Sequence, residues 1–239
     1  MIKFLTLNIL KYFDFYNQYK LFNFLKKNGY HEFDIFFDIG AHRGESIELF
    51  SKNFKIKKIY SFEPVKFNFQ NLKNFLVKFK KKNSKIYVNI ENIALGDANK
   101  KIKIKEFSES SSSTINDINF DSKYFKRKSF LVYKDSKIYN ENLVNQIKLG
   151  DYIKSKKITK NNFLKIDTEG FEMQVLTGLE EQFKKVSLIM FEHHYDNMLI
   201  KSYKFSDIHK LLKLNNFKQI YKYKMAFRKT FEYLYVKKD

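Results

Sequence analysis

Residues 33–50, FDIFFDIGAHRGESIELF, constrain the fold of this chain more than any other segment. An apolar run rich in Ile and Phe ends in Asp38, a turn with two glycines follows, and the next residues have helical spacing. This order predicts a buried strand, a tight turn and a helix, the form of a nucleotide-binding loop. An ordinary strand–helix turn is the competing interpretation, because short glycine motifs also occur without a ligand.

Strand-like and helical patterns alternate along the rest of the chain. Strands are expected at 57–64, 161–170 and 184–194, and residues 85–97 are expected to form a strand that runs into a turn. Helices are expected at 65–79, 171–179 and 206–214, and an antiparallel pair at 215–224 and 231–238. Residues 100–107 alternate strictly and could form half of a hairpin, whereas residues 108–130 are polar and irregular and predict a loop or insertion. The alternation predicts an α/β fold with a mostly parallel sheet covered on both faces.

The composition suits one globular domain. The 239 residues are 44% hydrophobic and include no cysteine, which excludes disulfides and thiolate metal sites and fits a reducing compartment, so we expect a cytoplasmic protein. No window has the ~18 uninterrupted apolar residues that a membrane span needs. The apolar start, broken by Lys11, Asp14 and Lys20, predicts one or two helices packed on the domain, without a signal peptide. An interfacial membrane helix, and thus peripheral membrane contact, is the alternative.

The formal net charge of +20 is compatible with nucleic acid, anionic membrane or anionic sugar partners. However, Arg43, Arg127 and Arg228 are the only arginines, so 43 of the 46 basic residues are lysine. Specific nucleic-acid readers favour arginine for bidentate contacts. We therefore interpret most of the charge as solvated surface and expect no specific nucleic-acid partner.

The residues at the strand ends indicate the kind of ligand. Gly40 permits a tight turn and Gly44 a close approach of the helix, whereas His42 would obstruct a pyrophosphate. Glu63 ends the next strand and could accept both hydroxyls of a ribose, although a surface carboxylate is the simpler alternative. These features favour a nucleoside ligand without a diphosphate, and S-adenosylmethionine (SAM) is such a ligand. Asp38 would then hold the amino group of its methionine part, directly or through water.

Six motifs along residues 33–194 are similar to those of one known family. In order they are FDIGAHRG, SFEP, NIALGD, SSSST, FLKIDTEGFEMQVLTGL and IMFEHH. Together they resemble the FkbM-type SAM-dependent methyltransferases, in which Asn is more frequent at the position of His42. The resemblance implies a Rossmann-like, class I methyltransferase domain over residues 31–239. Its seven-stranded sheet would end in the antiparallel pair. An N-terminal helical extension over 1–30 and an insertion near 108–145 would contribute to the choice of acceptor.

The resemblance also implies a set of cofactor-binding residues. Asn92 and Ala94 would lie along the adenine, although Asn92 is nearly as well explained as a turn former at a strand end. Serines 110–113 would lie near the cofactor or the acceptor, or else form a polar loop. The whole set implied for SAM is Asp38, Gly40, Ala41, His42, Gly44, Glu63, Pro64, Asn92, Ala94 and Asp167.

Methyl transfer to a hydroxyl benefits from a general base. Candidates at the ends of the fourth and fifth strands are Asp167, Glu169, Glu192, His193 and His194. Structural alternatives remain, because Glu169 could cap a helix, Lys165 could exist to pair with an acid, and one histidine is expected to be structural. Asp167, Glu169, Glu192 and His193 could instead hold Mg²⁺ or Mn²⁺, although a metal is not favoured.

These features predict a SAM-dependent O-methyltransferase that acts on a hydroxyl of a carbohydrate or sugar nucleotide, in capsule or lipooligosaccharide biosynthesis. Two alternatives stay open. A nucleic-acid methyltransferase would use the positive charge, but the sequence after the fourth strand is DTEG and not an N-P-P-Y-type tetrad. The other is a non-catalytic SAM- or nucleoside-binding module, which titration with SAM would separate from a plain scaffold.

Overall fold

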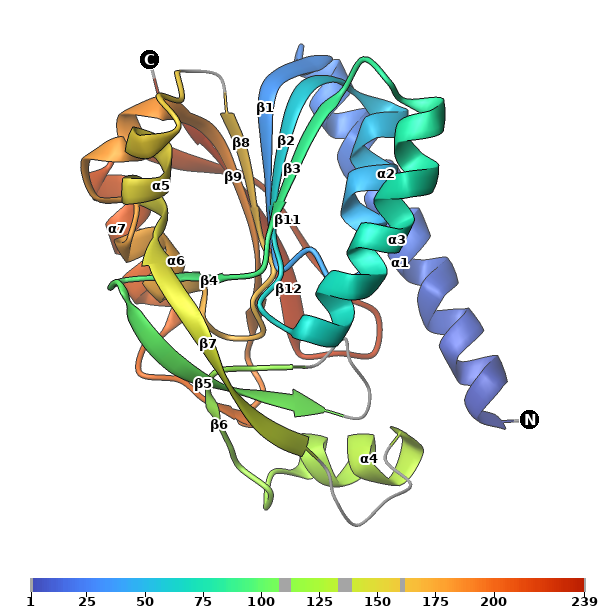
Figure 1. Cartoon of the computed structure of the whole chain (residues 1–239). Coiled ribbons are helices and arrows are strands. Elements are labelled where there is room, and N and C mark those ends of the chain that lie inside the picture. Colours follow the sequence, from blue (N-terminus) through green and yellow to red (C-terminus); the bar gives the residue numbers. More distant parts are fainter. Residues whose placement is uncertain (1, 108–112, 133–138, 160–161, 239) are drawn as a thin grey trace.

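A seven-stranded sheet lies at the centre of the computed structural model, which describes residues 2–107, 113–132, 139–159 and 162–238 (Figure 1). The strand order is β11-β12-β9-β8-β1-β2-β3. Five neighbouring strands run parallel: β1 (Glu32–Ile39), β2 (Lys55–Phe62), β3 (Tyr87–Glu91), β8 (Asn162–Ile166) and β9 (Val186–His194). The strand β12 (Thr230–Lys237) is antiparallel to both β9 and β11 (Phe217–Lys224). The predicted fold class and its C-terminal antiparallel pair are confirmed.

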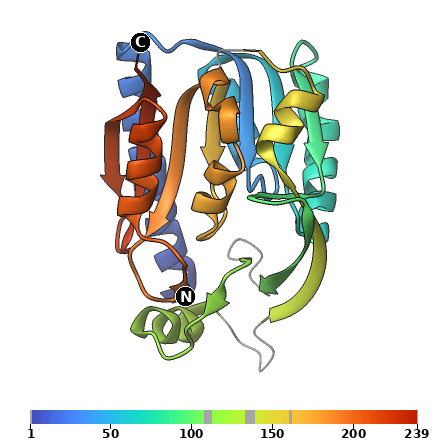
Figure 2. The same cartoon turned by 90° about the vertical axis from the view of Figure 1, so that its left-hand side faces the viewer.

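Helices cover both faces of this sheet (Figures 1 and 2). One face carries α1 (Ile2–Lys27), α2 (Glu45–Asn53) and α3 (Lys66–Lys82). The other carries α5 (Leu149–Ser155), α6 (Glu172–Thr177), the short 3₁₀ helix η2 (Glu180–Lys185) and α7 (Phe205–Leu214). Central strands are therefore apolar on both sides: Phe36 stacks on Phe50 of α2 at a ring-centroid distance of 4.5 Å, whereas Phe37 packs in the opposite core.

A second, smaller sheet lies beside the carboxyl ends of the main strands. It consists of β4 (Ala94–Gly96), β5 (Lys100–Phe107) and β7 (Tyr139–Lys148). The strand that was expected to run into a turn over 85–97 corresponds to β3, a turn and the short strand β4, which belongs to the second sheet. The side-chain amide of Asn92 donates to the carbonyl oxygens of Glu63 at 2.8 Å and Pro64 at 3.0 Å, which holds this turn. β5 is not half of a tight hairpin, since its partner β7 follows only after another helix.

The helix α4 (Lys123–Val132) lies in the region where an irregular segment was predicted, so that prediction is wrong there. The backbone N–H of Phe125 donates to the hydroxyl of Ser122 at 3.0 Å, which satisfies a free donor of the first turn. Phe125 is buried in a small cluster with Phe107, Ile118 and Leu199. The strands β6 (Asp117–Ile118) and β10 (Leu199–Ile200) pair beneath it.

The N-terminal segment forms one continuous helix, α1. Its last turns bury Leu21, Phe22 and Leu25 against the sheet and α2, with Phe22 at 5.2 Å from the ring of Phe50. The other end of α1 extends past α3 towards the end of the molecule at which the parallel strands finish (Figure 1). In the part of the chain that is described, no helix has the length and apolar character required to cross a membrane.

Candidate active site

The loop after β1 is fixed against both neighbouring strands. Gly40 has a φ of 82°, and a Cβ there would lie 1.8 Å from the carbonyl oxygen of Asp167. The backbone N–H groups of Gly40 and Ala41 both donate to the carbonyl of Phe62 at 3.0 Å. Gly44, with a φ of 98°, lies against the ring of Phe75. In this structure the two glycines therefore permit close packing of strands and helices around the loop.

Glu63 connects this loop to the start of α3. Its Oε2 accepts the backbone N–H of His42 at 2.8 Å, and its Oε1 accepts that of Val65 at 2.9 Å. The imidazole of His42 lies at 3.1 Å from Glu45, where α2 begins. Burial raises the pKa of Glu63 to about 7, although these hydrogen bonds oppose the shift.

Asp38 has no hydrogen-bond partner for either carboxylate oxygen, although the residue is fully buried. The nearest cation is the ammonium group of Lys165, at 3.7 Å. Burial raises the pKa of Asp38 to about 6, against the effect of Lys165, and Asp167 adds to the rise. A buried carboxylate without a donor is costly, so this one fits the amino group of a ligand such as SAM.

The other residues implied for the cofactor lie at the ends of β2 and β3. Pro64 and Asn92 line a cavity of about 430 Å³, together with Lys66 and Leu143. Asn92 is exposed and also holds the turn described above, and Ala94 is buried at the start of β4. Of the predicted serines, only Ser113 is among the described residues, since 110–112 lie outside them.

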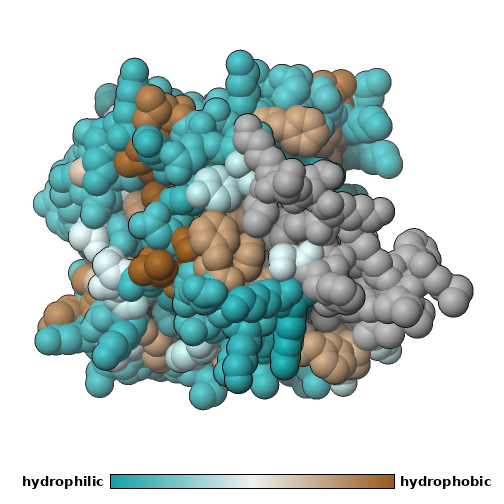
Figure 3. All heavy atoms as spheres, turned by 90° about the horizontal axis from the view of Figure 1, so that it is seen from below, coloured by the Kyte–Doolittle hydropathy of each residue, from teal (hydrophilic) through white to brown (hydrophobic). Residues whose placement is uncertain are grey.

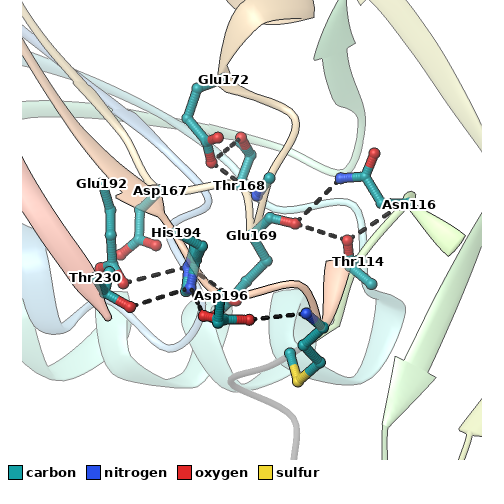
Figure 4. Close-up of polar contacts among 12 residues, drawn as sticks. Thr114, Asn116, Asp167, Thr168, Glu169, Glu172, Glu192, His194, Asp196 and Thr230 are labelled. Carbon is teal, nitrogen blue, oxygen red and sulfur yellow. Dashed lines mark hydrogen bonds and ion pairs between the residues drawn. The ribbon is translucent and has the colours of Figure 1, made fainter. Parts of the chain in front are cut away.

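The loop that follows β8 carries Asp167 and Glu169 and is held from two sides (Figure 4). The carbonyl oxygen of Glu169 accepts the Thr114 hydroxyl at 2.7 Å and the Asn116 amide at 3.3 Å. On the other side, the buried carboxylate of Glu172 accepts the Gly170 N–H at 2.9 Å. Glu172 also accepts the hydroxyl groups of Thr168 at 3.1 Å and Tyr203 at 2.5 Å. Asp167 itself is partly exposed, with its carboxylate 3.2 Å from the ammonium of Lys165.

His194 lies among three carboxylates (Figure 4). Its Nε2 is 3.4 Å from both Glu169 and Glu192, and its Nδ1 is 3.6 Å from Asp196. Burial alone would lower the pKa of His194, but these acids raise it to about 10. These contacts favour the protonated, positively charged imidazole. Burial and the charge of Asp167 raise the pKa of Glu192 well above its usual value.

His193 lies on the opposite face of β9, because successive side chains of a strand alternate. Its ring packs against Tyr195, Tyr203 and Phe205 at centroid distances of 4.8, 5.8 and 5.7 Å. Burial lowers the pKa of His193 to about 3, so the side chain is neutral. The structure does not bring it together with Glu192 or Asp167. In the chain as far as it is described, no group of three or more His, Asp or Glu side chains could hold a metal ion.

Several residues of this region did not stand out in the sequence. Glu232 is the cross-strand partner of Glu192, and burial raises its pKa to about 7, against the charge of Lys165. In the sequence, Glu232 could have been noticed as the one acid within the otherwise apolar and aromatic residues 231–236. Thr114 and Asn116 gave no local signal, because their partner, the carbonyl of Glu169, lies far away in the sequence. Asp196 lies only two residues after His194 but was not among the residues that the motifs singled out.

The strand order and the glycine turn after β1, with acids after β2 and β8, are those of a class I methyltransferase. The Methyltransferase FkbM domain matches residues 38–222, so the chain belongs to this family. The family resemblance noted in the sequence and the enzyme class, a methyltransferase, are confirmed. A search of curated protein sequences found no match.

Solved structures of methyltransferases are similar to this chain to different degrees, and one of them shows the same fold. An FkbM methyltransferase from Methylobacillus flagellatus KT has a TM-score of 0.53 and 17% identity, and the match covers 84% of this chain and 43% of that one. This chain thus spans less than half the length of that protein. The magnesium protoporphyrin IX methyltransferase ChlM from Synechocystis PCC 6803, with bound SAM, has a TM-score of 0.49 and 8% identity, over 93% of this chain and 78% of that one. TrmK of M. capricolum, in complex with S-adenosyl-homocysteine, has a TM-score of 0.48 and 12% identity, over 91% and 67%.

Proposed function

We propose that this chain is a SAM-dependent O-methyltransferase that acts on a hydroxyl group of a carbohydrate or sugar nucleotide. The observation that carries the proposal is the buried carboxylate of Asp38, which lacks a hydrogen-bond donor, beside a cluster of acids at the ends of β8 and β9. Asp38 would hold the amino group of SAM, and Glu63 would accept its ribose hydroxyls. Pro64, Asn92 and Ala94 would lie along the adenine. SAM supplies the activated methyl group, and the protein positions the acceptor and excludes water.

The acid cluster suits an acceptor that presents an uncharged, hydroxyl-rich ring to it, such as the sugar of a carbohydrate or of a sugar nucleotide. Carboxylates of Asp167, Glu169 and Glu192 can accept hydrogen bonds from several neighbouring hydroxyls, as sugars offer. The charged His194 keeps Glu169 and Glu192 in place. Asp167 is partly exposed and accessible from outside, so we assign it the role of general base, with Lys165 to orient its carboxylate.

A nucleic-acid acceptor is less compatible with this arrangement, because phosphodiesters would approach a set of carboxylates. Among the described residues, the cations in contact with this cluster are Lys165, the charged His194 and Lys201, whose ammonium group donates to the carbonyl of His194. A place in capsule or lipooligosaccharide biosynthesis, in the cytoplasm, rests on the family resemblance and belongs to the same proposal.

Methyl transfer from radiolabelled SAM to a panel of sugar nucleotides, glycans and RNA tests the proposal. We expect label in a carbohydrate product that survives mild base, as an ether does and an ester does not. Label in RNA alone would replace the proposed acceptor, and SAM binding without transfer to any acceptor would favour a binding module. A chelator arm, with Mg²⁺ or Mn²⁺ added back, tests whether a divalent cation takes part.

A further inference from the structure

The outward side of α1 carries a row of exposed aromatic side chains, which we call the aromatic stripe: Tyr12, Phe15, Tyr16 and Tyr19. Their spacing of three, four and seven residues places them on one side of the helix. The buried residues Leu21 and Leu25 lie on the opposite side, against the sheet. A row of exposed aromatic side chains that faces away from the core of its own domain indicates a surface that binds another protein or a membrane.

This part of α1 is attached to the domain in a fixed position. The carboxylate of Asp14 pairs with the guanidinium of Arg228, in the turn between β11 and β12. The ring of Phe13 packs edge-on against Phe227 of the same turn at 5.7 Å, and Phe227 is itself largely exposed. Phe24 packs against Tyr221 of β11 at 4.7 Å. The stripe is therefore a preformed surface and not a loose extension.

Cations border the stripe. The ammonium group of Lys20 lies 4.3 Å above the ring of Tyr16, and the exposed Lys229 lies in the turn between β11 and β12 that also carries Phe227 and Arg228. Within the described residues 12–20 and 221–229 the one acid is Asp14, which Arg228 already neutralises. Phenylalanine and tyrosine beside lysine suit the headgroup level of a bilayer, where anionic lipids attract the lysines.

We propose that the aromatic stripe and the neighbouring lysines dock this protein on a membrane surface rich in anionic lipid. A second copy of the chain is a poorer occupant, because each copy carries a net charge of +20 and the lysines beside the stripe would face each other. The first turns of α1 lie at the end of the molecule where the parallel strands finish (Figures 1 and 2). That end, seen in Figure 3, is mostly hydrophilic with isolated apolar residues. Docking through α1 would hold the carboxyl ends of the strands close to the membrane. The docking proposal does not depend on which acceptor is methylated.

Sedimentation with vesicles tests the proposal, with phosphatidylglycerol-rich vesicles compared with pure phosphatidylcholine. The stripe variant carries Tyr12→Ser, Phe15→Ser and Tyr19→Ser, which remove side chains that are 57–68% exposed. The matched control carries Val77→Ser, Tyr87→Ser and Leu214→Ser, which are 55–75% exposed and lie on α3, β3 and α7. Exposed positions such as these change folding stability little, and thermal melts of both variants check this.

We expect the wild-type protein to bind the anionic vesicles at low ionic strength and to be released at high ionic strength. The stripe variant should bind at least about tenfold more weakly, whereas the control should bind as the wild type does. Failure of the wild type to bind anionic vesicles would overturn the proposal, as would equal losses in both variants. A concentration-dependent dimer that the stripe variant alone abolishes, without vesicle binding, would assign the surface to a second copy instead.

Discussion

Replacement of Glu63 by glutamine separates the stability of the fold from the binding of SAM. Burial raises the pKa of Glu63 from 4.5 to about 7, so the folded protein binds this proton more tightly than the unfolded chain does. The free energy of unfolding therefore falls as the pH rises from about 4.5 to about 7. By about pH 8 the ionised carboxylate costs about 3 kcal/mol relative to an unshifted group.

Glu63→Gln removes this cost but introduces another. An amide has one acceptor oxygen, so one of the two backbone N–H groups, of His42 or of Val65, loses its acceptor, at about 1–3 kcal/mol. At about pH 8 the two effects nearly cancel, and we expect a variant as stable as the wild type within about 1.5 kcal/mol. Its stability should also change less with pH than that of the wild type. Denaturant titrations at about pH 5 and pH 8 measure both quantities.

SAM affinity should respond differently. Hydrogen bonds to a charged carboxylate contribute about 1.5–3 kcal/mol each, so Glu63→Gln should weaken SAM binding at least about tenfold by calorimetry. Glu48→Gln, on the exposed side of α2, is the control and should leave the affinity unchanged. Unaltered SAM affinity in a folded Glu63→Gln protein would refute the assignment of the ribose site. An unaltered pH dependence of stability would refute the reasoning on ionisation.

The remaining predictions concern the buried and catalytic acids and the binding of RNA to the positively charged surface. Asp167→Asn should leave SAM affinity nearly intact and lower turnover on the true acceptor by roughly 10²–10⁴-fold, and near-normal turnover would exclude Asp167 as the base. Burial raises the pKa of Asp38 from 3.8 to about 6 and that of Glu232 from 4.5 to about 7. The ligand-free protein should therefore lose thermal stability as the pH rises from about 4 to about 7. A thermal stability that increases over this range would contradict the burial of these acids. Tyr203→Phe leaves one oxygen of the buried Glu172 without its donor and should destabilise the fold by about 1–3 kcal/mol in denaturant titrations, and no change would show that this contact is dispensable. RNA binding should be weak and steeply salt-dependent, and sequence-specific binding that persists at high salt would be inconsistent with a background charge.

The main sheet was predictable because its signals are local. Apolar runs such as residues 33–39 and 162–166 end in glycines and acids, and strand ends of a parallel sheet meet at one edge. The adjacent histidines at the end of β9 were both candidates, with one of them expected to be structural, and strand alternation allows only one of them to share a face with Glu192. That signal was present in the sequence, and the structure shows the result: His194 lies among acids and His193 among aromatic rings.

Other parts of the site could not be predicted in the same way. Thr114 and Asn116 donate hydrogen bonds to the carbonyl oxygen of Glu169, which lies more than fifty positions away in the sequence. Nothing in the local sequence indicates these contacts. Phe125 of the helix α4 packs in an apolar cluster to which the neighbouring β6 and the more distant β5 and β10 contribute, and the distant members give no local signal. The raised pKa of His194 likewise depends on Glu169, Glu192 and Asp196 meeting around one ring.

A crystal structure with S-adenosyl-homocysteine, the product that SAM leaves behind, tests the central claim most directly. We expect the amino group of the ligand on the carboxylate of Asp38, its ribose hydroxyls on Glu63, and its sulfur on the side of Asp167. That result would place the transferable methyl group beside the acid cluster at the ends of β8 and β9. A nucleoside bound elsewhere, with Asp38 still without a donor, would contradict the cofactor site and the mechanism that rests on it.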